Sequence, residues 1–221
     1  MRTAEGAGVT GIIMSRETTD IYNPKTIRST MGSLYRKTTL MQILAGAIRP
    51  DAGEISFFGK NPLQKRTYFR KYVGYVPQEP PLIEELTVKD NLKLWGVWQS
   101  EHRELLLSSF ELEELLKTEV RKLSGGMKRR LSIACALAQW PPILLLDEPT
   151  TALDLYYKDN IQQWLMQYRS MNGIVLLTSH DENEILSCDR CLIMKQGKLT
   201  ELMGEDLTIE EIRKEIITPD K

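Results

Sequence analysis

The sequence predicts an α/β domain built on a mostly parallel β-sheet that is flanked by helices. Ile143–Leu146 and Ile174–Leu177 are continuously apolar, as strands are when both faces of a parallel sheet are covered. Polar groups follow closely, with Asp147 and Glu148 after the first run and His180 shortly after the second. Ligands of such sheets bind at the carboxyl ends of the strands. We therefore expect a ligand site where these two strands end.

Length and composition bound the possible functions. The 221 residues suffice for one α/β domain, or for a domain with a small subdomain. The formal net charge of −1 argues against nucleic acid as a partner, because nucleic-acid-binding surfaces are usually basic. No apolar run approaches the roughly eighteen residues of a membrane-spanning helix. The N-terminus also lacks the apolar core of a signal peptide.

The three cysteines fit a reducing compartment. Cys188 and Cys191 have the spacing of a redox or metal-binding pair, but no second pair accompanies them. We interpret them as ordinary buried thiols.

The first half of the chain alternates predicted helices and strands. Residues 1–36 show no strong periodicity, whereas the apolar spacing from Thr38 to about Ala47 predicts a helix. A turn at Arg49–Gly53 leads to short strands at Ile55–Phe58 and Tyr72–Val76. Pro77 ends the second strand because proline cannot donate to a strand ladder.

The middle of the chain reads as helical. Thr87 is a suitable N-cap for one helix, and apolar residues recur with helical spacing over Glu104–Lys117. Another helix begins at Ser124 and ends at Pro141. We interpret the basic run Lys128–Arg130 as a solvated face of that helix.

The last part of the chain returns to α/β structure. Tyr156–Met171 is amphipathic and predicts a helix. Asp181–Ser187 predicts a short helix, and the strands Arg190–Met194 and Leu199–Leu202 form a small antiparallel part around the Gln196-Gly197 turn. A final helix is expected over Leu207–Ile217.

Five motifs resemble those of the ATP-binding cassette (ABC) ATPases and follow one another in that family's order. They are a Q-loop at Gln78, a signature at Ser124-Gly125-Gly126, a Walker B strand at Ile143–Glu148, a D-loop at Thr150–Asp154 and a switch histidine at His180. Each motif alone is common, but the ordered set is specific. The resemblance implies a P-loop NTPase core at residues 37–80 and 141–221, with a helical subdomain inserted at residues 81–140.

The resemblance also implies catalytic roles with ATP and Mg²⁺. Glu148 would orient and polarise the attacking water, and His180 would contact the γ-phosphate. Asp147 and the Thr38 hydroxyl would hold Mg²⁺. Gln78 would reach both the metal ion and the water.

The remaining implied contacts bind the nucleotide. Ser124 begins a helix, whose N-terminus suits an anion, and the family's signature binds the γ-phosphate held by a partner subunit. Asp154 would contact the opposite subunit. The residues assigned to nucleotide binding are Lys37, Thr38, Thr39, Ser124, Gly125, Gly126 and Asp154.

The phosphate loop departs from its expected form, G-x-x-x-x-G-K-[ST]. Lys37 and Thr38 supply the ending, but Met31 and Arg36 stand where the two glycines are expected. Those glycines permit unusual dihedrals and a close approach of the backbone to the phosphates. Two interpretations stay open, a natural divergent subunit and a reading frame disrupted upstream of Lys37. Reading the coding DNA in the other frames distinguishes them.

The combined prediction is an ATP-hydrolysing subunit of a membrane ABC transporter. It would pair with a transmembrane permease subunit and a second ABC ATPase subunit, as a homodimer or heterodimer, at the cytoplasmic face of the cell membrane. One alternative is a catalytically impaired subunit that lends Ser124 to a partner's ATP. Another is a soluble ABC ATPase acting on DNA or ribosomes, although the tandem cassettes, coiled coil or basic arm typical of these are not visible.

Overall fold

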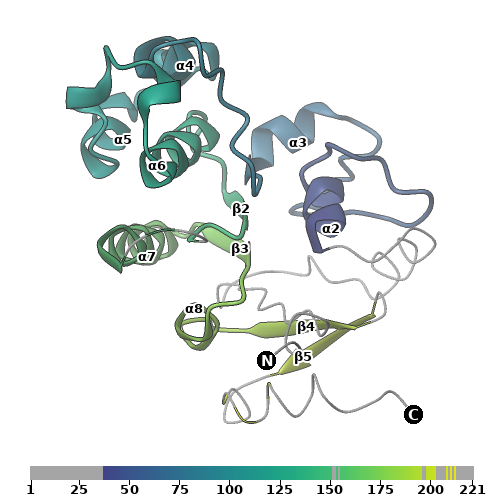
Figure 1. The fold of residues 1–221 in the computed structure, drawn as a ribbon. Helices are drawn as coiled ribbons and strands as arrows, with labels where there is room; N and C mark the ends of the chain where they lie inside the picture. The colour runs from purple at the N-terminus through teal and green to yellow at the C-terminus, as the bar shows by residue number, and fades with distance from the viewer. Residues whose placement is uncertain are drawn as a thin grey trace.

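A three-stranded parallel sheet forms the centre of the computed structural model, which describes residues 37–150, 153, 155–195, 198–202, 208, 210 and 212 (Figure 1). The strand order is β1 (Val73–Val76), β2 (Ile143–Asp147) and β3 (Ile174–Thr178). The register places Asp147 beside Thr178, so both strands deliver polar residues to the same edge. The predicted parallel sheet and both buried strands are confirmed.

The central strand β2 divides two hydrophobic cores because its successive side chains point to opposite faces. Leu144 and Leu146 belong to one core, and Ile143 and Leu145 to the other. Every residue of β2 and β3 is buried, which explains the continuous apolar runs.

Helices cover both faces of the sheet (Figure 1). The first core includes the buried sides of α6 (Gly125–Ala136) and α7 (Leu155–Ser170). The second packs against α2 (Lys37–Leu44) and α3 (Thr67–Tyr72). The predicted helix at Tyr156–Met171 is therefore confirmed, whereas α3 was not predicted.

The segment between β1 and α6 is helical in short pieces, although the division at residues 81 and 140 stays a prediction. Thr87 caps α4 by accepting a hydrogen bond from the Asp90 amide, as predicted. The continuous helix expected over Glu104–Lys117 is wrong. The helix α5 ends at Ser109, and Glu111 then has a φ of 49°, which is not a helical value. The elements are α4 (Val88–Leu94), η1 (Val97–Gln99), α5 (Arg103–Ser109), η2 (Glu113–Leu115) and η3 (Val120–Lys122).

Two other boundaries differ from the predictions. The strand expected at Ile55–Phe58 is a single antiparallel bridge between Phe57 and Lys60. The turn between them has positive φ at Phe58 (50°) and Gly59 (72°), as in a two-residue hairpin turn, but the pairing does not extend beyond this bridge among the described residues. The helix α6 ends at Ala136, several residues before Pro141.

A small antiparallel pair completes the fold, as predicted. The helix α8 (Glu182–Leu186) leads to β4 (Cys191–Lys195), which pairs with β5 (Lys198–Leu202). The helix expected over Leu207–Ile217 lies largely outside the described residues.

The three cysteines are free and buried, as interpreted from the sequence. Burial raises the pKa of the Cys188 thiol and raises that of Cys191 to about 11. Among the described helices, none has the length and apolar character needed to cross a membrane.

Candidate functional site

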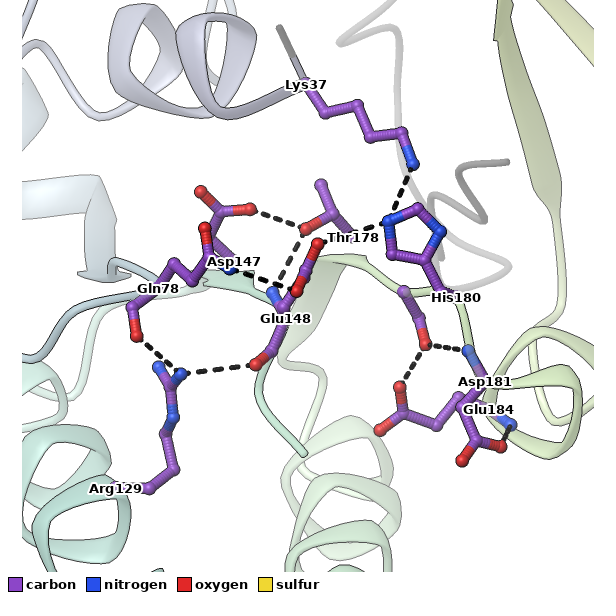
Figure 2. Close-up of polar contacts among 10 residues, drawn as sticks. Lys37, Gln78, Arg129, Asp147, Glu148, Thr178, His180, Asp181 and Glu184 are labelled. Atoms are coloured by element: carbon purple, nitrogen blue, oxygen red, sulfur yellow. Dashed lines mark hydrogen bonds and ion pairs between the residues drawn. The ribbon is translucent and has the colours of Figure 1, made fainter. Parts of the chain in front are cut away.

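The carboxyl ends of the three parallel strands meet at one edge of the sheet. The loop after β1 carries Gln78, β2 ends in Asp147 and Glu148, and His180 stands two residues after β3. Lys37 reaches the same edge from the first position of α2 (Figure 2). The fold thus gathers residues that are up to 143 positions apart in the sequence.

The Glu148 carboxylate lies at the centre of this cluster. Gln78 Nε2 donates to Glu148 Oε2 over 3.2 Å, and His180 Nε2 lies 3.2 Å from Glu148 Oε1. The same imidazole nitrogen lies 3.3 Å from Lys37 Nζ. One nitrogen therefore faces both a cation and a carboxylate, and it either accepts from Lys37 or donates to Glu148 according to the tautomer of the imidazole.

The backbone of Glu148 adopts an uncommon conformation. Its φ is 50°, in the left-handed region that residues other than glycine rarely adopt. The Glu148 amide donates to Thr178 Oγ1 over 3.0 Å and also lies 3.1 Å from the Thr178 carbonyl oxygen. Strained backbone of this kind gathers at functional sites, where surrounding contacts hold it in place.

Asp147 is 2% exposed, and its two oxygens differ in their contacts. Oδ1 accepts from Thr178 Oγ1 over 2.6 Å, whereas Oδ2 is buried without a hydrogen-bond partner among the described residues. A buried carboxylate oxygen without a donor suits a cation, and carboxylates are preferred Mg²⁺ ligands. The nearby Tyr75 hydroxyl is also buried and unpartnered, and burial together with the charge of Asp147 raises its pKa to about 12.

The Lys37 ammonium brings a positive charge to the site, next to His180. Burial lowers its pKa to about 8, while Glu148 and Asp147 act in the opposite direction. Thr38 and Thr39 follow in the first turn of α2, which carries no acidic residue. An anion is favoured at such a helix start.

The signature residues occupy the N-terminus of α6. Ser124 Oγ accepts a hydrogen bond from the Met127 amide over 3.2 Å, so the predicted cap is present. Ser124 and Gly125 are exposed, and a Cβ built on Gly125 would meet no atom within 4 Å. Gly126 is buried, with Tyr157 close to where its Cβ would stand.

Sequence reasoning missed Arg129 and misread its neighbours. Arg129 and Arg130 are 5% and 4% exposed, so the interpretation of Lys128–Arg130 as a solvated face is wrong for both arginines. Arg129 donates to backbone carbonyl oxygens of the Gln78 loop and of Glu148. Charge type alone gave no signal for this role.

Two other residues were missed. Thr178 binds Asp147 and the Glu148 amide, and its place at a strand end was the available signal. The buried Glu184 accepts hydrogen bonds from the Thr150 and Ser179 hydroxyls. No pattern in the sequence indicated that Glu184 is buried.

Some predicted site residues fall outside the described part of the chain. They are Asp154 and the two loop positions Met31 and Arg36. The roles assigned to Asp154 and to the other predicted site residues stay predictions.

The fold and these strand-end groups define the P-loop NTPase class. The family described as ABC transporter matches residues 37–151, and the chain belongs to it. The dimeric ATP-binding cassette MJ0796, in a post-hydrolysis state with ADP and Pi, superposes with a TM-score of 0.70 at 25% identity. This match covers 89% of this chain and 96% of that one.

Relatives in sequence are ATP-binding proteins of transport systems. Nod factor export ATP-binding protein I of Burkholderia lata is 37% identical, over 73% of this chain and 56% of that protein. EcfA1, the energy-coupling factor transporter ATP-binding protein of Mycoplasma pneumoniae, is 34% identical over 74% and 63%. The lipopolysaccharide export protein LptB of Acidithiobacillus ferridurans is 36% identical over 74% and 72%. The chain thus spans less than two thirds of the length of the first two of these relatives.

Proposed function

We propose that this chain binds and hydrolyses ATP as the nucleotide-binding subunit of a membrane ABC transporter. One observation carries the proposal. The Glu148 carboxylate is held between Gln78 and His180, directly after a buried Asp147 that has one unpartnered oxygen. This arrangement supplies a base for water beside a place for a cation, and Lys37 adds a positive charge for phosphate.

Each residue has a defined task in this scheme. Glu148 accepts a hydrogen bond from the attacking water and draws off its proton as the oxygen bonds to the γ-phosphorus. The bond from the γ-phosphorus to the bridging oxygen breaks, and ADP leaves with that oxygen. Gln78 holds one Glu148 oxygen in place. Lys37 and His180 bind the γ-phosphate, which would replace their mutual contact.

The residues present also fit Mg²⁺. Asp147 Oδ2 and the Thr38 hydroxyl are the groups that would hold it, directly or through water. Bound there, the ion would neutralise charge that develops on the phosphate oxygens.

The proposal extends to an assembly of several subunits. Ser124, Gly125 and Gly126 would bind the γ-phosphate held by a second ABC subunit, identical or different, and Asp154 would contact that subunit. The dimeric MJ0796 structure supports this arrangement. The relatives' export and energy-coupling roles support a transmembrane permease partner and a position at the cytoplasmic face of the cell membrane.

Calorimetric titration of the full chain with Mg-ATP tests nucleotide binding. We expect micromolar affinity in the wild type and its loss in Lys37→Ala, because the ammonium is the principal cation of the site. Circular dichroism checks that both chains are folded. Saturable phosphate release in the wild type supports hydrolysis, whereas a folded chain that binds no Mg-ATP contradicts the proposal.

Met31 and Arg36, in place of loop glycines, favour a second candidate. In that case the chain is a catalytically impaired subunit that lends its signature to a partner's ATP. It would bind Mg-ATP poorly alone yet stimulate hydrolysis by an intact ABC subunit, and Ser124→Arg would abolish the stimulation. A glycine-rich loop in another frame of the upstream DNA would instead indicate a disrupted copy of an active subunit.

A further inference from the structure

We propose that Arg129 is a positioning residue that fixes the Gln78 loop and Glu148 relative to helix α6. The inference rests on the proposed function, since it assigns a role within the same site. It also makes a structural claim about the chain without nucleotide, and that claim can be tested separately.

The guanidinium of Arg129 joins three backbone carbonyl oxygens from two distant segments, and Figure 2 shows the contacts with Gln78 and Glu148. Nη1 donates to the Pro77 oxygen over 2.7 Å. Nη2 donates to the Gln78 oxygen over 2.8 Å and to the Glu148 oxygen over 3.2 Å. The side chain therefore contacts the backbone of Gln78 and of Glu148, whose side chains are hydrogen-bonded to each other.

An arginine suits this position for a geometric reason. Its planar guanidinium presents several N–H groups in fixed directions, so one side chain can bind carbonyls from two segments. The bond to Glu148 also serves a residue in the left-handed conformation at the end of β2. A lysine would bring the same charge but only a compact ammonium on a flexible stem. It would not hold all three oxygens at these distances.

The position of Arg129 on α6 gives the contact a further consequence. The helix begins after Ser124, and Arg129 lies five residues on, about 7.5 Å along the axis. A continuous helix moves as a unit, so a displacement of its N-terminus also displaces the guanidinium. If a second subunit's nucleotide bound the signature and moved the start of α6, the Gln78 and Glu148 of this chain would move as well. Arg129 links the two events through the backbone.

Arg130 provides a control on the same helix. It is as buried as Arg129, but it pairs with Glu111 and lies over the Tyr157 ring at 4.6 Å. Its substitution removes a buried arginine without removing a bond to the Gln78 loop. Lys128, which pairs with Glu84, controls for the loss of a neighbouring surface charge.

Hydrogen–deuterium exchange of the full chain without nucleotide is the first test. Arg129→Met should raise the exchange rate about tenfold in a peptide covering residues 143–150, which contains the hydrogen-bonded Glu148 amide, the ratio expected for losing charge-assisted hydrogen bonds. Arg129→Lys should raise it by a smaller factor. Arg130→Met should leave this peptide within twofold of the wild type. Equal exchange there in folded Arg129→Met, Arg130→Met and wild type would overturn the proposal.

Steady-state ATP hydrolysis is the second test. Arg129→Met should lower kcat by about 10- to 100-fold and change KM for ATP less than threefold, because the nucleotide contacts remain while the water-orienting pair shifts. Lys128→Met should retain the wild-type kcat. A rise in KM with an unchanged kcat would overturn the positioning role.

The two tests separate the possible failures. If the wild type hydrolyses no ATP, the proposed function fails, and the exchange measurement still decides the role of Arg129. If Arg129→Met does not fold, Arg129→Lys keeps the charge and is compared with the wild type in the same peptide. Unchanged exchange in a folded Arg129→Lys would then overturn the proposal.

Discussion

Gln78 Nε2 donates a hydrogen bond to Glu148 Oε2 over 3.2 Å, although the two residues are 70 positions apart in the chain. The contact joins the loop after β1 to the end of β2, the neighbouring parallel strand. Because Gln78 is exposed and Glu148 only partly buried, the hydrogen bond alone contributes little to stability. Its value is to fix the direction of a carboxylate that already lies in strained backbone.

Glu148→Gln is expected to separate hydrolysis from binding. The amide keeps the size of the side chain but does not accept a proton, so kcat should fall by roughly 10²- to 10⁴-fold, the usual contribution of a general base. Mg-ATP affinity should stay within threefold of the wild type. Phosphate release and calorimetric titration measure the two quantities.

The exposed Glu79 offers a matched control one residue from Gln78. Glu79→Gln makes the same chemical change nearby and should retain the wild-type kcat. A Glu148→Gln chain that hydrolyses ATP at more than a third of the wild-type rate would show that this carboxylate is not the base.

Thr178→Val is expected to lower the free energy of unfolding by about 1–3 kcal/mol, because it leaves buried polar groups unpaired. The Thr178 hydroxyl donates to Asp147 Oδ1 and accepts from the Glu148 amide, and the side chain is buried. Urea unfolding at pH 7 measures the loss. Thr178→Ser keeps the hydroxyl and should lose much less, so equal losses in both variants would assign the effect to packing.

Much of the sheet was predictable because a parallel strand that is buried on both faces must be apolar throughout. The apolar runs Ile143–Leu146 and Ile174–Leu177 therefore predicted both strands. The polar residues after them indicated the edge where ligands bind. The cap at Thr87 was also predictable, because it depends only on neighbouring residues. A threonine before a helix can accept a hydrogen bond from an amide of the first turn.

The burial of Arg129 and of Glu184 could not be predicted because most of their partners lie far away along the chain. A charged residue is read as exposed unless something shows what neutralises it. The three carbonyls that bind Arg129 lie up to 52 residues away, and the Thr150 hydroxyl that binds Glu184 is 34 residues away. The break at Glu111 was hidden for another reason, since the apolar spacing continued past the end of the helix.

Asn91 connects the loop beyond Gln78 to α4, and its loss should destabilise the fold. The side chain is fully buried, accepts from the Ile83 amide over 2.9 Å, and donates to the Ile83 and Thr87 oxygens over 3.0 and 3.1 Å. Asn91→Leu should lower the free energy of unfolding by about 1–3 kcal/mol, because the Ile83 amide loses its acceptor and the Ile83 and Thr87 oxygens each lose one of two donors. Thermal or urea unfolding measures this.

Asn91→Asp gives a sharper comparison. It keeps the acceptor for the Ile83 amide but turns the two donors into an acceptor that faces carbonyl oxygens. We expect it to be destabilised at pH 7 at least as much as Asn91→Leu. An aspartate variant as stable as the wild type would contradict the role of the two donated hydrogen bonds.

Glu184 should make stability depend on pH in a direction unusual for a carboxylate. It is 3% exposed and accepts hydrogen bonds from the Thr150 hydroxyl, over 2.7 Å, and from the Ser179 hydroxyl. Burial raises its pKa above the ordinary value of 4.5, and the charge of Asp181 adds to this. The two hydroxyls and the Lys158 charge oppose the rise without cancelling it.

The sign of the effect follows from proton binding. Between 4.5 and the higher pKa of the folded state, the folded chain binds more protons at Glu184 than the unfolded chain does. The Glu184 contribution to the free energy of unfolding therefore falls as pH rises through this window. Asp181, whose pKa is lowered first by its hydrogen bond with Lys158, contributes in the opposite direction and loses its contribution at low pH.

Glu184→Gln isolates this contribution because Asp181 and Lys158 remain in both chains. The free energy of unfolding of the variant, minus that of the wild type, should rise as pH increases from 4.5 through the higher pKa of Glu184 in the folded chain. Urea unfolding at four or five pH values measures it. A Glu184→Gln difference that is constant with pH would mean that Glu184 has the same pKa in the folded and unfolded chains.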